Sequence, residues 1–157
     1  MSAVIVCASV SHGNTRRVAD VMARVLGATV VSPEDAEPAR LAEAELVGFG
    51  SGVFYGKLHP RLTSCAEVLP GGRGRAFVFA TSGLPEVPLM PFTRPLVRLL
   101  EGKGFSVVGS FSCRGLDTWM PFKLVGGIRK QRPNADDLAA AHAFAQGLRG
   151  GPSGDYC

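Results

Sequence analysis

The stretch Ser9-Val10-Ser11-His12-Gly13-Asn14-Thr15 lies between an apolar run, residues 3–8, and a segment whose apolar residues recur at helical spacing. The apolar run has the composition and length of a buried strand. The residues at helical spacing are Val18, Val21, Met22 and Val25, and they predict a helix over residues 15–26. The chain therefore begins with a strand, a short hydroxyl-rich turn and a helix.

This arrangement is typical of an anion site. The first backbone N–H groups of a helix have no partner within the helix, and the helix dipole leaves positive potential beside them. Gly13 lets the backbone approach a ligand closely. Further donors come from the side chains of Ser9, Ser11, Asn14 and Thr15. We expect a phosphate group here, and the alternative of a polar turn that only caps the helix stays open.

The same stretch disfavours other phosphate loops. It lacks the Gly-Lys-Ser/Thr ending of a triphosphate loop, and it has one glycine where a dinucleotide fingerprint has three. A phosphatase loop that began at Cys7 would need an arginine where Gly13 stands. The nucleophile reading of Cys7 therefore fails.

Length and composition favour one soluble domain. We expect a domain over residues 1–150 and a tail over residues 151–157, because 157 residues suffice for one substantial core. With 46% hydrophobic and 19% charged residues, disorder is not expected. The sequence shows no membrane-spanning run and no signal-like N-terminus, which predicts a cytoplasmic protein.

Charge and cysteine spacing exclude further classes. The net charge of +4 is unevenly placed, with an excess of basic residues in 94–132 and of acidic residues in 34–45. Aromatic interleaving and a known nucleic-acid module are absent, so we expect no nucleic-acid partner. The cysteines lack metal-binding spacing, so no metal site is expected; they are Cys7, Cys65, Cys113 and Cys157. We interpret Cys7 as a buried thiol in a central strand.

Further strands and helices alternate along the chain. Strands are predicted over residues 28–31, 46–49, 75–80 and 105–111, and helices over 38–43, 61–69, 94–101 and from the capping Asn134 to about Leu148. Five apolar strands separated by helices predict a parallel sheet with helices on both faces. Ligands of such sheets bind beyond the carboxyl ends of the strands. The loops expected there are 9–15, 50–60, 81–91 and 112–133.

Over residues 3–149 the chain resembles the flavodoxin family. The resemblance rests on the 9–15 loop, on Gly50-Ser51-Gly52-Val53-Phe54-Tyr55-Gly56 and on Thr81-Ser82-Gly83. It implies a doubly wound five-stranded parallel sheet of order 2-1-3-4-5, the order for which flavodoxin itself is the type example. It also implies flavin mononucleotide (FMN) as cofactor. The phosphate would be held by Ser9, Ser11, His12, Gly13, Asn14 and Thr15. The flavin ring would lie along Ser51, Gly52, Val53, Phe54 and Tyr55, with Thr81, Ser82 and Gly83 at its opposite edge.

The sequence departs from electron-carrying flavodoxins in two places. Leu84 and Pro85 stand where an aromatic residue would flank the ring, and the later half of the chain is basic rather than acidic. The 112–133 segment is long for a connection and resembles an insertion of some short-chain bacterial flavodoxin-like proteins. Because it follows the last strand, Cys113, Gly115 and Trp119 are added to the candidate cofactor-binding residues. Trp119 is expected near the flavin or at a homodimer interface.

Three functions fit the sequence. The first is an FMN protein that transfers electrons to a redox partner protein or to a small-molecule acceptor. The second is an FMN-dependent oxidoreductase of the quinone reductase or oxidase type, and the third is a cofactor-free binding domain. No protein-side catalytic residue is predicted, because His12 lies in the phosphate loop and neither His59 nor His142 has an obvious carboxylate partner.

Overall fold

Five parallel strands form the centre of the fold. The computed structural model describes residues 2–8, 14–54, 57–72, 74–81, 93–113 and 135–149. The parallel strands are β1 (Ala3–Ala8), β2 (Thr29–Val31), β3 (Leu46–Phe54), β5 (Arg75–Thr81) and β6 (Ser106–Cys113). Their order is β2-β1-β3-β5-β6, which confirms the predicted order of the five parallel strands. A short strand, β4 (Lys57–Leu58), pairs antiparallel with β3.

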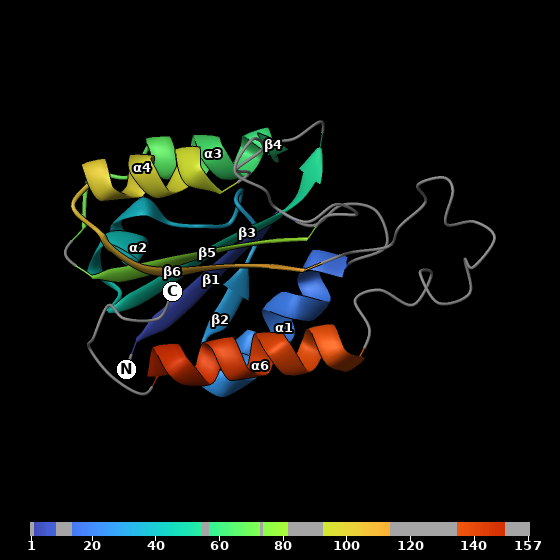
Figure 1. The fold of residues 1–157 in the computed structure, drawn as a ribbon. Coiled ribbons are helices and arrows are strands. Elements are labelled where there is room, and N and C mark those ends of the chain that lie inside the picture. The colour runs from blue at the N-terminus through green and yellow to red at the C-terminus, as the bar shows by residue number, and fades with distance from the viewer. Residues whose placement is uncertain are drawn as a thin grey trace.

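Helices cover both faces of this sheet (Figure 1). One face carries α1 (Asn14–Leu26) and α6 (Ala135–Arg149). The other carries α2 (Pro38–Glu43), α3 (Pro60–Glu67) and α4 (Arg94–Gly102). The elements agree closely with the predicted ones, because strongly periodic apolar residues specify each of them locally. The sheet therefore has one apolar core on each side.

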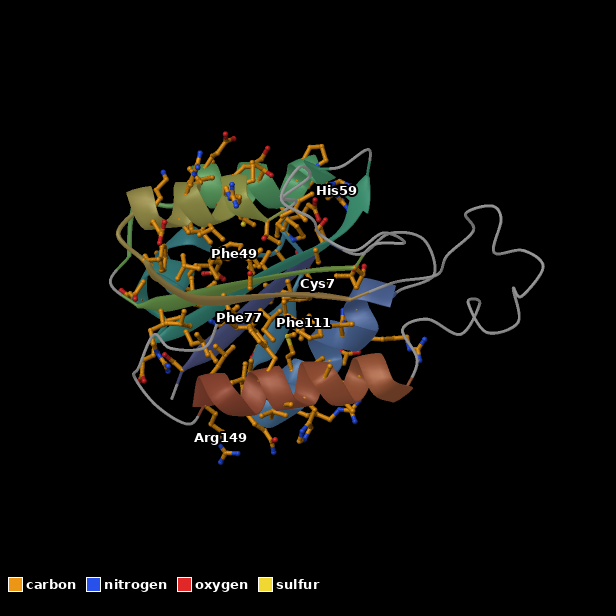
Figure 2. All side chains as sticks on the ribbon, in the orientation of Figure 1. Cys7, Phe49, His59, Phe77, Phe111 and Arg149 are labelled. Atoms are coloured by element: carbon orange, nitrogen blue, oxygen red, sulfur yellow. The ribbon has the colours of Figure 1, made fainter. Side chains whose placement is uncertain are left out.

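Strand residues alternate between the two cores. In β1, Val4 and Val6 face α3, whereas Ile5 and Cys7 face α1. All six residues of β1 are buried, as expected of a strand covered by helices on both faces. Figure 2 shows the same division, with Phe49 on the side of α3 and α4 and with Phe77 and Phe111 on the side of α6.

The glycines of β3 make room for aromatic rings from β5. A Cβ atom on Gly48 would overlap the ring of Phe77, and a Cβ atom on Gly50 would overlap the ring of Phe79. The centroids of these two rings are 6.0 Å apart and the ring planes are 25° from parallel. Phe144 of α6 packs edge-on against Phe77, with the two ring centroids 6.0 Å apart, so the rings also hold α6 against the sheet.

β3 is longer than predicted. The sequence predicted a strand that ends at Phe49 and a glycine-rich loop over residues 50–60, but β3 continues to Phe54 and then turns back into β4. The prediction treated the glycines as turn signals. In the folded chain Gly50 and Gly52 are strand positions, and the ring of Phe79 from β5 covers Gly50, which a local reading cannot detect.

We predict that Gly48→Ala destabilises the protein by about 1–3 kcal/mol, because the new methyl group would displace the buried ring of Phe77. The measurement is the free energy of unfolding in urea. Gly102→Ala is the matched control, since a Cβ atom there meets nothing within 4 Å. A Gly48→Ala variant as stable as the control would contradict this packing.

Candidate functional site

The carboxyl ends of β1 and β3 are where this topology positions a ligand. β2 pairs with one side of β1 and β3 with the other, so the chain reverses its direction of winding between β1 and β3. Parallel sheets bind ligands at the carboxyl ends of the strands beside such a reversal. α1 starts at residue 14, shortly after β1 ends at residue 8, so its N-terminus lies at this edge.

The first turn of α1 suits an anion. It holds no acidic side chain, although helices commonly have acidic residues there. Arg16 is held by Asp20 at 2.9 Å, one turn further along the helix. The unpaired N–H groups and the dipole of α1 are therefore left without a negative charge in the first turn.

Thr15 and Thr81 are brought together. Their Oγ1 atoms lie 2.7 Å apart, within hydrogen-bonding distance, although 66 residues separate them in the sequence. Thr15 is 3% exposed and Thr81 is 5% exposed. The sequence placed one at the phosphate and the other at the ring edge, and the structure joins the two regions by this bond.

The Ser51 hydroxyl forms hydrogen bonds within the protein. Its fully buried hydroxyl accepts a hydrogen bond from the His59 N–H at 2.8 Å and donates to the carbonyl of Gly52. Ser51 thus ties the end of β3 to the start of α3. Contact between this residue and a flavin ring stays a prediction, and its hydroxyl is already occupied within the protein.

His59 is a positioning residue that the sequence did not reveal. Its Nδ1 atom accepts a hydrogen bond from the Arg61 N–H at 3.0 Å, so the imidazole caps α3. Arg61 also forms an ion pair with Glu34 at 2.9 Å, which links α3 to the segment after β2. The signal in the sequence was Pro60, since proline is favoured at the first position of a helix and the cap precedes it.

The other candidate residues lie outside what the structure describes. This holds for Ser9, Ser11, His12, Gly13, Tyr55, Ser82, Gly83, Gly115 and Trp119. The side chains of Asn14, Val53, Phe54 and Cys113 are likewise not described, although the backbone of each belongs to a helix or strand. Gly52 is described and pairs in register with Thr81. The roles of these residues toward a cofactor stay predictions.

Cys7 is a buried thiol of β1, an interior strand of the sheet, as predicted. Burial raises its pKa from 9.0 to about 12, Arg16 lowers it slightly and Asp20 raises it. Burial, and then Glu34, also raise the pKa of Cys65. Both groups are thiols rather than thiolates at neutral pH, so neither has the reactivity of a nucleophile.

The described residues contain neither a cluster of metal-ligating side chains nor a membrane-spanning helix. Among them, no three histidine, cysteine or acidic side chains converge as metal ligands would. The helices of the described part also lack the length and apolar character needed to cross a bilayer.

The chain matches known proteins over most of its length. A family model described as a flavodoxin domain matches residues 5–68. An uncharacterized protein of Methanocaldococcus jannaschii is 35% identical over 148 residues, which cover 94% of this chain and 98% of that protein.

Solved structures share the fold. Oxidised flavodoxin 1 from Bacillus cereus has a TM-score of 0.73 at 18% identity, over 98% of this chain and 100% of that chain. The apo form of EMOB, an NADH:FMN oxidoreductase, has a TM-score of 0.63 at 18% identity, over 94% of this chain and 89% of that chain. At such identities the likeness concerns the fold, which a flavodoxin and an NADH:FMN oxidoreductase share here.

Ser51→Ala should lower the free energy of unfolding by about 1–3 kcal/mol, because it leaves the N–H of His59 without its acceptor. Chemical unfolding would measure the change. Ser64→Ala, an exposed serine of α3, is the control and should have little effect. Equal stability of the two variants would show that the Ser51 bond contributes nothing.

Stability should depend on the Cys7 thiol at high pH. The folded-state pKa is raised, so the unfolded chain loses this proton first, and stability present below pH 9.0 is lost between pH 9.0 and 12. Between pH 8 and pH 10, the wild type should lose about 1.4 kcal/mol more than Cys7→Ala. Urea unfolding at both pH values tests this, because other titrating groups cancel in the comparison. Parallel pH profiles would refute it.

Proposed function

The chain belongs to the flavodoxin family, and we propose that it binds FMN and transfers electrons to a redox partner protein or a small-molecule acceptor. The observation that carries the proposal is the N-terminus of α1, which lies at the topological switch of the sheet and has no acidic side chain in its first turn. A phosphate ester is the ligand that such a helix end favours.

The donors present fit the phosphate of FMN. The first turn of α1 supplies backbone N–H groups, and the predicted loop of residues 9–15 supplies hydroxyl and amide groups without a carboxylate. A dianion placed there would meet donors on the protein side and no like charge within the loop. The loop holds no carboxylate, the anionic ligand that Ca²⁺ and Mg²⁺ sites in proteins commonly use.

The ends of β3 and β5 would hold the flavin ring. Gly52 and Thr81 lie opposite each other in the sheet, and the loops predicted to bind the ring follow them. Bound FMN would supply the reversible uptake of electrons, while the chain would bind and orient the ring and exclude water from it. The Ser51–His59 contact would fix the β3 end of this arrangement.

Ser11→Asp should weaken FMN binding at least about tenfold, because it places a carboxylate against a dianionic phosphate. Flavin fluorescence titration of the apo protein would give the affinity. Ser106→Asp makes the same change at an exposed residue that begins β6, at the amino end of the parallel strands. It should leave FMN affinity unchanged. The proposal fails if the wild type does not bind FMN, and equal affinities for FMN in the two variants would rule out the loop.

A turnover assay separates the two flavoprotein functions. An electron carrier loaded with FMN should exchange electrons with a protein partner and should oxidise NADH slowly in the presence of a quinone. Rapid steady-state quinone reduction would instead support the oxidoreductase alternative.

A further inference from the structure

The Thr15–Thr81 hydrogen bond crosses a strand. β1, which leads into α1, is not adjacent to β5, because β3 lies between them. On the α1 side of β3, alternation places Gly52 above Gly48 and Gly50, and Gly52 is in register with Thr81. Without a side chain on Gly52, the two hydroxyls can meet over the end of β3. The pair is thus the polar continuation of the Phe77 and Phe79 packing.

This bond is directional, whereas the core residues that α1 packs against the sheet in the described part of the chain are apolar. The buried residues on the inner face of α1 are Val18, Ala19, Met22 and Leu26. Apolar packing is non-directional and tolerates small shifts along the helix axis. A hydrogen bond of 2.7 Å between two buried hydroxyls fixes the first turn of α1 relative to the end of β5.

The hydroxyl protons add a second constraint. Each threonine hydroxyl has one proton to donate and two lone pairs to accept with. If Thr15 gives its proton to an anion beside the start of α1, the proton between the two threonines must come from Thr81. Donation from Thr81 then strengthens the bond that Thr15 makes, because linked hydrogen bonds polarise one another.

We propose that Thr81 is a positioning residue for the phosphate end of the cofactor site and that it acts through Thr15 rather than by touching the flavin. The inference rests on the proposed FMN function. Thr81 ends β5, just before a loop predicted to bind the flavin ring, yet the inference gives it an effect on phosphate binding.

The test compares FMN with riboflavin, which has the same ring and lacks the phosphate. Thr81→Val keeps the shape of the side chain and removes its donor, so it should weaken FMN about tenfold and change riboflavin affinity by less than about twofold. Thr81→Ser restores the hydroxyl and should bind both flavins like the wild type. Equal weakening of FMN and riboflavin in Thr81→Val would show a ring contact and overturn the proposal.

A double-mutant cycle tests whether Thr81 acts through Thr15. In a Thr15→Val background, Thr81→Val should change FMN affinity by less than about twofold, because the partner that it positions is already absent. The double variant should also regain the apo stability that Thr81→Val loses, since it leaves no unpaired buried hydroxyl. The proposal would be overturned if the losses of FMN affinity from the two single variants added in the double variant. It would also be overturned if the double variant recovered FMN affinity as well as stability.

The result for the wild type distinguishes failure of the Thr81 role from failure of the proposed FMN function. If wild-type protein binds neither flavin, the FMN function fails and the role of Thr81 fails with it. If the wild type binds FMN and Thr81→Val binds it equally well, the FMN function stands and the positioning role alone is overturned. Unfolding curves of each apo variant verify that every affinity refers to folded protein.

Discussion

The structure depends on two glycines, Gly48 and Gly50, at successive positions on one face of β3. Gly48 and Gly50 leave a channel across β3, and Phe77 and Phe79 of β5 fill it with their rings. Phe144 of α6 packs against the same rings. At Gly48 and Gly50 this face of β3 is therefore covered by rings of the neighbouring strand rather than by side chains of its own. The position of β5, and with it the position of α6, follows from this packing.

Because side chains alternate along the strand, the two faces of β3 make different contacts at its end. On one face the absent side chain of Gly52 lets Thr15 and Thr81 meet. On the other face Ser51 is fully buried and bonds to the backbone of His59, which begins α3. Hydroxyl groups thus join α1 to the end of β5, and the end of β3 to the start of α3. The polar contacts are buried, where hydrogen bonds are strong and unsatisfied groups are costly.

The sequence predicted the elements that local patterns specify. Apolar runs gave the five parallel strands, and helical spacing gave the helix after the first loop, because both signals lie within the element itself. The continuation of β3 and its pairing with β4 were missed, since the rings that occupy its glycine positions lie some thirty residues away in β5. The Thr15–Thr81 bond was equally out of reach, because sequence alone does not bring residues 66 positions apart together. The cap that His59 forms on α3 was missed although its signal, Pro60, is local.

The electrostatics of α1 explain why position matters more than charge at this site. Arg16 is paired with Asp20, and both side chains are about half exposed, so water and salt screen what remains of the arginine's charge. The local attraction for an anion then comes chiefly from the N–H groups and dipole of the first turn, and this attraction falls off within that turn. Hydrogen bonds weaken steeply when their geometry is poor. A site of this kind requires the start of α1 to be held in place, and the buried bond between Thr15 and Thr81 is the contact placed to hold it.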